Sequence, residues 1–310
     1  MASPSHLIRV SAGISLLVSQ SLLSAQQPFT IMVKTQEVAL SFHAEDSAGR
    51  SVSDLVANDM SVRDNGKHPE KIMQFVHNTN LPVRAAIVFD VSVSMQGAGP
   101  QRRIAQQLAG TVLQSSTDQA MIVRFDFETQ VQQDWTSDKQ QLIAAAYHVT
   151  DQYGSRLGGT ALWDTLYRVC RDHIPAQVPG SEVSANAVLL FTDGDDNASH
   201  ALPEDVIDMC SQRETPIYPF VIDDRTHFDA GQKALRELAE RTGGRVFYDQ
   251  NVEGSAEQSI QQINKELRDR YTLVYRPRPM KLDGSFHSVK LECPYRAVQL
   301  SVRDGYFAAK

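Results

Sequence analysis

The sequence contains few cysteines, and none of them lies at the spacing of a metal-binding pair. Its 310 residues include three cysteines, Cys170, Cys210 and Cys293, and no CxxC pair. Structural zinc sites and thioredoxin-like redox centres are therefore weakly supported. An odd count leaves at least one thiol unpaired, and we expect most of the three to be small, buried apolar side chains. Their disulfide state stays open from sequence alone.

The chain also lacks an excess of positive charge. It has 30 Lys and Arg against 37 Asp and Glu, a formal net charge of −7, and no basic stripe. Proteins that bind phosphate backbones use clustered Lys and Arg. A nucleic-acid partner is therefore not expected.

The common catalytic motifs are missing as well. The nine His residues are scattered, with no HExxH, and no serine lies in GxSxG. The glycine-rich pieces "GAGPQ", "GSRLGG" and "TGGR" match neither a P-loop nor GxGxxG. Because no nucleophile has an assignable base, we predict that the protein is not an enzyme.

The first 25 residues hold one Arg and no acidic residue. His6 and Arg9 precede a Ser-rich apolar run from Ala12 to Leu23, which is typical of a secretory signal peptide. We place cleavage after Ala25, which leaves a mature chain at −7 − 1 = −8 that is secreted or periplasmic. The alternative is a retained N-terminal membrane anchor, although the run is short for a spanning helix.

The two ends of the chain have the texture of β-strands. In "EVALSFHA", Val38, Leu40, Phe42 and Ala44 share one face, and Asn65-Gly66 predicts a hairpin between two short strands. Strand-like alternation returns after residue 270 in "YTLVYRP", "FHSVKLEC" and "AVQLSVRDGYF". We predict one small β-sandwich of about seven strands, built from residues 26–80 and 271–310 together.

The middle of the chain, residues 81–270, alternates between strand and helix patterns. Apolar strands are expected at 84–90, 120–126, 186–192, 216–222 and 245–248. Helical apolar faces lie between and after them: Ile104, Leu108 and Val112; Leu142, Ile143, Ala146 and Tyr147; Leu162, Leu166, Val169 and Cys170; Val206, Ile207 and Cys210; Leu235, Leu238 and Ala239; Ile260, Ile263 and Leu267. This rhythm predicts an α/β fold, a doubly wound, mostly parallel sheet with helices on both faces, inserted in the β-sandwich.

Oxygen-bearing side chains gather where these strands end. Asp90, Ser92 and Ser94 follow the first strand, Asp193 follows the strand at 186–192, and Thr160 follows Gly158-Gly159. The carboxyl ends of parallel strands share one sheet edge, so these groups can converge. Oxygen-only ligands suit Mg²⁺, Mn²⁺ or Ca²⁺. The plain alternative is that they are turn and cap residues.

These motifs resemble the metal-ion-dependent adhesion site of the von Willebrand factor type A (VWA) domain. The resemblance rests on "DVSVS", the Thr of "GGTALWD" and the Asp of "FTDG", and the flanks resemble bacterial secreted VWFA-related proteins. It implies that Ser92 and Ser94 ligate the metal directly and Thr160 directly or through water. Asp90 and Asp193 would act mainly through water, and an acidic residue of a protein ligand would complete the coordination.

The resulting expectation is a cation-dependent, adhesion-type protein-binding module. Two alternatives stay open: a Mg²⁺-dependent phosphoryl-transfer enzyme with Asp90 as nucleophile, and a module whose ion only stabilises it. The sequence does not name the partner or the oligomeric state. A shift of the last helix, about 254–270, would pass directly into the β-domain strand at 271. We expect the loop at Asp195, Asp196 and Asn197 to be solvated, Trp163 to be in the core, and Arg102 and Arg103 to lie on a solvated face.

Overall fold

The computed structural model describes residues 37–95, 107, 110–149, 158–176, 184–221, 230–248, 252–279 and 281–308. The expected signal peptide, with its cut after Ala25, lies outside these residues and stays a prediction. The same holds for Arg102 and Arg103 and for the helical positions Ile104 and Leu108.

A six-stranded sheet forms the centre of the α/β part, in the order β6-β5-β4-β7-β8-β9. All neighbouring strands run parallel except the edge strand β6, which is antiparallel to β5. The strands are β4 (Val83–Asp90), β5 (Gln119–Phe125), β6 (Thr129–Thr136), β7 (Ala185–Thr192), β8 (Ile217–Val221) and β9 (Phe247–Tyr248). The five expected strands are present, and β6 was missed.

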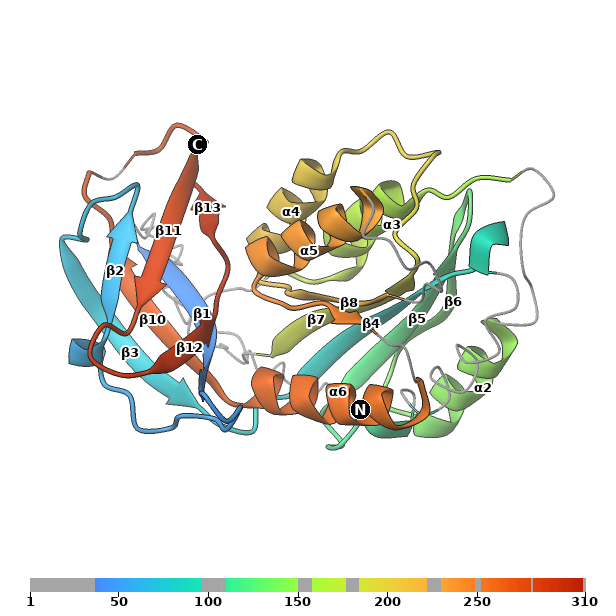
Figure 1. Ribbon diagram of the computed structural model, residues 1–310, viewed down its shortest axis with the longest axis horizontal. Coiled ribbons are helices and arrows are strands. Elements are labelled where there is room, and N and C mark those ends of the chain that lie inside the picture. Colours follow the sequence, from blue (N-terminus) through green and yellow to red (C-terminus); the bar gives the residue numbers. More distant parts are fainter. Residues whose placement is uncertain are drawn as a thin grey trace, which may run out of the picture. The chain divides into compact units, whose positions relative to one another are not determined.

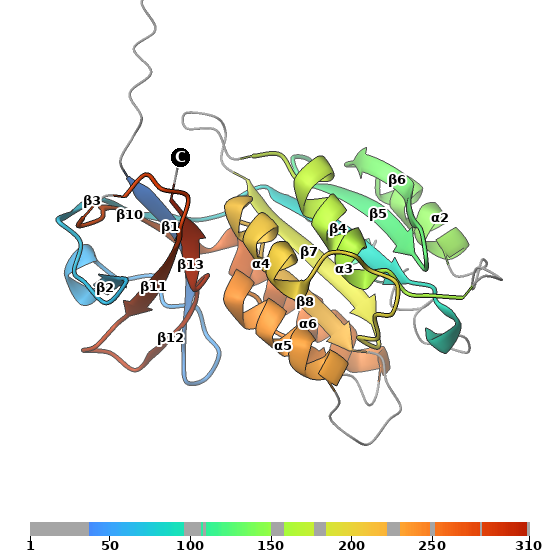
Figure 2. The ribbon, with the colours of Figure 1, turned by 90° about the horizontal axis from the view of Figure 1, so that it is seen from above.

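Helices cover both faces of this sheet (Figures 1 and 2). One face carries α3 (Leu162–Arg168), α4 (Pro203–Gln212) and α5 (Ala230–Thr242), and the other carries α2 (Lys139–Val149) and α6 (Val252–Arg268). All eight residues of β7 are buried, which is why its sequence is continuously apolar instead of alternating. The predicted α/β fold with a mostly parallel sheet is confirmed.

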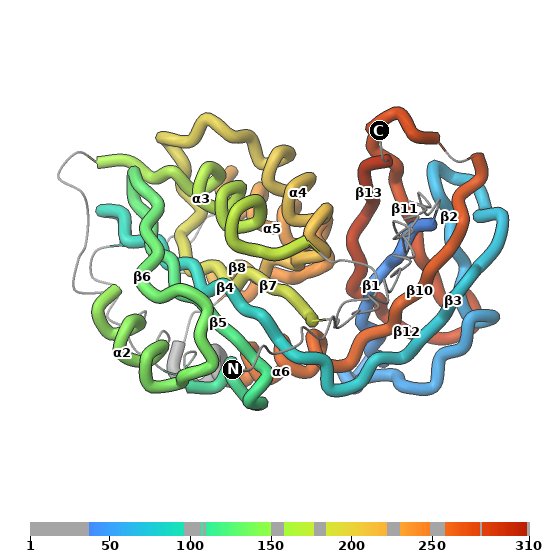
Figure 3. Tube along the Cα trace, turned by 180° about the vertical axis from the view of Figure 1, so that it is seen from behind, coloured from blue at the N-terminus to red at the C-terminus, as the bar shows by residue number. Residues whose placement is uncertain are grey.

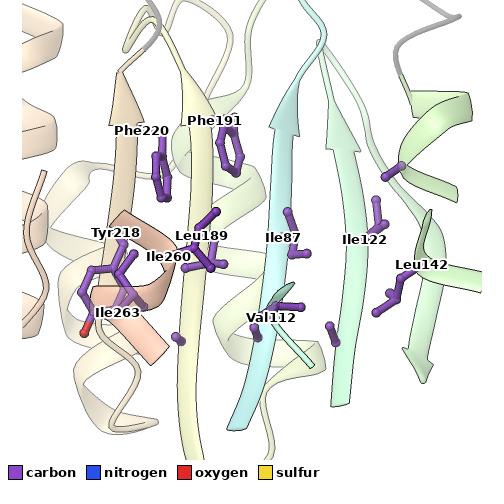
Figure 4. Close-up of a cluster of buried hydrophobic side chains, with 14 of the residues drawn as sticks. Ile87, Val112, Ile122, Leu142, Leu189, Phe191, Tyr218, Phe220, Ile260 and Ile263 are labelled. Atoms are coloured by element: carbon purple, nitrogen blue, oxygen red, sulfur yellow. The ribbon is translucent and has the colours of Figure 1, made fainter. Parts of the chain in front are cut away.

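Successive residues of each strand point to opposite faces and build two separate cores. Ile87 and Phe89 pack in the cluster under α2 and α6, whereas Ala86 and Val88 join the cluster under α3, α4 and α5. Figure 4 shows the first cluster, in which Ile260 and Ile263 of α6 lie against side chains of the sheet. Burial of aliphatic and aromatic side chains on this scale is the main force that holds such a sheet together.

The expected helical faces are largely as predicted. Among the described members, Leu162, Leu166, Leu235 and Leu238 are fully buried, and Trp163 is in the core as expected. Tyr147 is an exception, because it is 46% exposed on α2. The omission of β6 has a simple cause: "TQVQQDWT" is an edge strand with little buried surface, so its sequence has no apolar alternation to detect.

Segments from both ends of the described chain form two further sheets around one core. The first sheet has the order β12-β1-β10-β3 and the second β13-β11-β2. Their strands are β1 (Val38–Asp46), β2 (Ser61–Asp64), β3 (Lys71–Asn78), β10 (Arg270–Arg276), β11 (Phe286–Glu292), β12 (Val298–Ser301) and β13 (Gly305–Phe307). Figure 3 shows the blue β1 beside the orange and red β10 and β12, with which it pairs.

The prediction of a hairpin at Asn65-Gly66 is wrong, because the strands on either side of the turn do not pair with each other. The turn itself forms, with φ of 46° at Asn65 and 77° at Gly66, and Asp64 bridges Lys67 across it. However, β2 pairs with β11, and β3 pairs with β10 in the other sheet. The chain crosses between sheets after the turn, which the local sequence pattern cannot reveal because the partner strands lie about 190 to 230 residues away.

The structure decides the disulfide state of the cysteines, which the sequence left open. Cys170, in a π-helical segment after α3, forms a disulfide with Cys210 of α4. Both residues are fully buried, and Cys293 is a buried free thiol. The expectation of burial therefore holds, but two of the three are cross-linked.

The last helix of the α/β part runs almost directly into a strand of the other sheets. Only Asp269 separates α6 from β10. Arg268 at the end of α6 holds the buried Asp118 carboxylate through Nη1–Oδ1 and Nη2–Oδ2 contacts of 3.0 and 2.6 Å. The connection needed for a helix shift is present, and the shift itself stays a prediction. No helix in the described ranges combines the length and apolar character that crossing a membrane requires.

Candidate metal site at the sheet edge

Asp90 and Thr192 meet at the carboxyl end of the central sheet. Phe89 of β4 lies beside Phe191 of β7, so the next residues of both strands leave at the same edge. The Thr192 hydroxyl donates to Asp90 Oδ2 at 2.7 Å, and the Ser92 N–H donates to Asp90 Oδ1 at 2.9 Å. Both carboxylate oxygens of Asp90 are thus fixed in place, and the side chain is fully buried.

The burial of Asp90 has an electrostatic consequence. Desolvation raises the pKa of Asp90 to about 7, against the hydrogen bonds from Ser92 and Thr192, which lower it. The negative charge of Asp193 raises this pKa further. A carboxylate held out of water beside a second carboxylate is stabilised by a nearby cation, so this edge favours a positive ligand.

The two serines of the DxSxS motif lie close together after β4. Ser92 Oγ and Ser94 Oγ are 3.1 Å apart, in or beside the short 3₁₀ turn Val93–Met95. Ser92 is buried and Ser94 is exposed, so the pair reaches from the buried Asp90 toward the surface. Two hydroxyl oxygens at this separation can face one small cation together.

Thr160 comes to this region from the loop before α3. It is 4% exposed, and its N–H donates to Asn197 Oδ1 at 2.8 Å. The next residue, Ala161, donates its N–H to the Asp126 carbonyl at 2.8 Å. Asp126 follows the end of β5, which pairs with β4, so the Thr160 loop is held near the same sheet edge.

Asp193 follows Thr192 directly and is 5% exposed. Its Oδ1 accepts the Asp195 N–H at 3.1 Å, and Gly194 N–H donates to the Thr192 hydroxyl at 3.0 Å. These hydrogen bonds fix the turn that follows β7. Because the Thr192 hydroxyl also donates to Asp90, this turn is tied to the end of β4.

The structure brings Asp90, Ser92, Ser94 and Asp193 together at one edge and holds the Thr160 loop there. Within the described ranges, no group of three or more His, Cys, Asp or Glu residues could hold a metal ion. A cation at this edge would therefore depend on hydroxyl oxygens and water in addition to Asp90 and Asp193. Such a donor set fits a hard divalent ion such as Mg²⁺. A complete adhesion site is not shown.

Three residues that the sequence motifs do not indicate also shape this region. Thr192 was assigned to the strand, yet its hydroxyl holds Asp90. Asp196 and Asn197 were expected in a solvated loop; Asn197 is exposed and Asp196 is half-buried, and their side chains also accept the N–H groups of Thr160 and Leu162. Asx side chains often bind backbone donors, but the partners here are 34 and 37 residues away, which no local pattern indicates.

The fold and these motifs agree with a comparison against protein families. The model of the von Willebrand factor type A domain matches residues 84–247, which is 164 of the 310 residues. The chain belongs to this family. No curated protein matched the sequence.

Several solved structures are similar to this chain. A von Willebrand factor type A protein from Catenulispora acidiphila is 14% identical and aligns over 82% of this chain and 75% of its own, with a TM-score of 0.46. BatB from Bacteroides thetaiotaomicron is 17% identical over 59% of this chain and 98% of its own, with a TM-score of 0.45. Proximal thread matrix protein 1 from the mussel byssus is 19% identical over 65% and 50%, with a TM-score of 0.49. Likeness at this level carries no argument about function.

Proposed function

We propose that this protein is a secreted or periplasmic protein-binding module whose binding depends on a divalent cation. Asp90, Ser92, Ser94, Thr160 and Asp193 would hold Mg²⁺, or Mn²⁺ or Ca²⁺. The partner would be a protein that presents an Asp or Glu side chain to the ion. The observation that carries the proposal is the buried Asp90, fixed by Thr192 and Ser92 beside a pair of serine hydroxyls.

Charge is the physical reason for such capture. The ion would contact few anionic protein ligands, because its donors are mostly hydroxyls and water. The ion would therefore attract an incoming carboxylate strongly. It would attract a neutral side chain much less. This makes an acidic residue the preferred contribution of the partner.

The disulfide favours an oxidising compartment. Cys170 and Cys210 are joined in the α/β part of the chain, and disulfides persist mainly in secreted, extracellular and periplasmic proteins. This agrees with the expected signal peptide in residues 1–25. The disulfide and the predicted signal peptide thus favour export on independent grounds.

The burial of Asp90 speaks against the phosphoryl-transfer alternative. A nucleophilic carboxylate has to reach the phosphorus atom of its substrate. Asp90 is fully buried, and both of its oxygens accept hydrogen bonds. A generic phosphatase substrate should therefore not be hydrolysed, with Mg²⁺ present or absent.

Calorimetric titration of Mg²⁺ and Mn²⁺ into EDTA-treated, dialysed protein tests the cation. Wild type should bind one ion, and Asp90→Ala should bind none. Asp54→Ala removes a carboxylate that is 74% exposed in the segment between β1 and β2, and it should bind like wild type. Circular dichroism of each variant checks the fold. Absence of binding by the folded wild-type protein would overturn the proposal.

Capture of a partner protein tests whether binding of that partner depends on the cation. Wild-type protein and Asp193→Ala would be used as bait on proteins secreted by the native organism, with Mg²⁺ or with EDTA. A partner retained only by wild type and only with Mg²⁺ is expected. If the ion raises the melting temperature but no partner depends on it, the ion only stabilises the module.

A further inference from the structure

The loop that carries Thr160 is fastened to the loop that follows Asp193. The Thr160 N–H donates to Asn197 Oδ1 at 2.8 Å, and the Thr160 carbonyl accepts the N–H groups of Asn197 and Ala198, each at 3.1 Å. Both peptide groups of Thr160 are therefore bonded to the same short segment. This closes a ring of hydrogen bonds between residues far apart in sequence.

A second contact fixes the start of α3, just after Thr160. The N-cap residue of α3 is Ala161, which has no side-chain oxygen to bind the N–H groups of the first turn. The first N–H of α3, that of Leu162, is satisfied by Asp196 Oδ1 at 2.9 Å. Within the described ranges, the structure shows no hydrogen bond from the Thr160 hydroxyl. Asp196, and not Thr160, therefore satisfies the first N–H of this helix.

The backbone before Thr160 is shaped to allow this packing. Gly159 has a φ of +134°, and a Cβ there would lie 3.2 Å from Phe127 Cδ2 and 3.5 Å from Ala198 Cβ. A side chain at 159 would therefore strain the backbone and crowd these neighbours. The close approach of the two loops depends on this glycine.

The contacts continue along the two segments, away from the sheet edge. Asp164 Oδ1 accepts the N–H groups of His200 and Ala201 at 3.0 and 2.7 Å. Farther on, the Cys170–Cys210 disulfide joins the elements that follow each loop. The two loops are therefore held together at several points, and among the described residues Asn197 is the one whose side chain bonds to Thr160 itself.

We propose that Asn197 and Asp196 are positioning residues that hold Thr160 ready for the cation. Asn197 fixes the Thr160 backbone, and Asp196 fixes the start of α3 two residues farther on. This inference rests on the proposed function for its purpose, and it assigns Asp196 and Asn197 of the loop to the support of the cation site. Partners that orient a metal ligand typically contribute about 10- to 100-fold to metal affinity.

The test compares Asn197→Ala with Asp164→Ala, which breaks hydrogen bonds between the same two segments farther from Thr160. Manganese affinity would be measured by calorimetry at 25 °C, and the exchange of the Thr160 amide by hydrogen exchange. Asn197→Ala should weaken Mn²⁺ binding about tenfold and speed Thr160 amide exchange. Asp164→Ala should bind Mn²⁺ within about twofold of wild type. Asn197→Asp, which keeps the acceptor oxygen, should bind Mn²⁺ more tightly than Asn197→Ala.

Each of the other outcomes would overturn the positioning role, the proposed function or both. If Asn197→Ala binds Mn²⁺ like wild type, the positioning role is wrong and the proposed cation site stands. If Asp164→Ala weakens binding as much as Asn197→Ala, the contacts serve general stability and the positioning role is again wrong. If folded wild type does not bind Mn²⁺, the proposed function fails and this inference fails with it.

Discussion

Reduction of the Cys170–Cys210 disulfide should destabilise the α/β part of the protein by several kcal/mol. The bond closes a loop with a sequence separation of 40 residues. Cross-linking removes conformational entropy from the unfolded chain, roughly 2.1 + 1.5R ln n cal/mol/K for n residues. For this loop the relation gives about 4 kcal/mol at 25 °C, a large part of the 5–15 kcal/mol typical of a folded domain.

Urea denaturation with and without reductant would measure this loss. Both tryptophans, Trp135 and Trp163, belong to the α/β part, so their fluorescence reports on its unfolding. With an m-value of about 2–3 kcal/mol/M, the midpoint should fall by roughly 1.5 M urea. A Cys293→Ala background would prevent thiol exchange with the free cysteine.

Cysteine variants check independently that the loss of stability comes from the disulfide. Cys170→Ala and Cys210→Ala each break the same bond, so the double variant should cost far less than the sum of the two single variants. Coincident urea curves for the oxidised protein and for protein shown by thiol titration to be reduced would refute the reasoning. The cross-link would then contribute nothing through the unfolded chain.

Two further predictions concern buried charge. Burial raises the pKa of Glu266 to about 7 against the lowering effect of Arg245, so the folded state holds a proton that the unfolded state has lost above pH 4.5. Wild-type stability should therefore fall by roughly 3 kcal/mol between pH 4.5 and 7 relative to Glu266→Gln, and parallel stability curves in urea would contradict this. The Asp64 carboxylate accepts hydrogen bonds from Tyr275 and Tyr306 at 2.9 and 2.8 Å and lies 2.8 Å from His287 Nδ1. Tyr306→Phe should cost about 1 kcal/mol and Asp64→Ala more than about 3, because the alanine leaves buried partners unpaired; equal melting temperatures would refute this order.

Much of the α/β part could be predicted because its strands and helices have characteristic local patterns of apolar residues. Continuous apolar runs such as that of β7 indicate strands covered on both faces, and the faces containing Leu162 and Leu235 have helical spacing. The edge strand β6 escaped prediction because an edge strand buries little surface and needs no regular apolar pattern. The pairing of β2 and β3 with distant strands escaped it for a different reason, since a turn specifies its own backbone and not the sheet that each arm joins.

The candidate site divides in the same way. Asp90, Ser92, Ser94 and Asp193 follow strands whose order and direction can be inferred, so their meeting at one edge could be expected from sequence. The support around them could not be expected, because the hydrogen bonds from Thr192 to Asp90 and from Thr160 to Asn197 span 102 and 37 residues. Side-chain pairing over such separations depends on how the strands are placed. It produces no periodic pattern in the sequence.

The sequence by itself determined the α/β rhythm, the positions of the strand ends and the oxygen-bearing side chains placed there. Those features follow from the alternation and helical spacing of apolar residues, which act over a few residues at a time. Only the tertiary structure decided that Cys170 meets Cys210, that Thr192 holds Asp90, and that Asp196 and Asn197 hold the Thr160 loop. The reason is that each of these contacts depends on segments brought together by packing of the whole sheet and its helices.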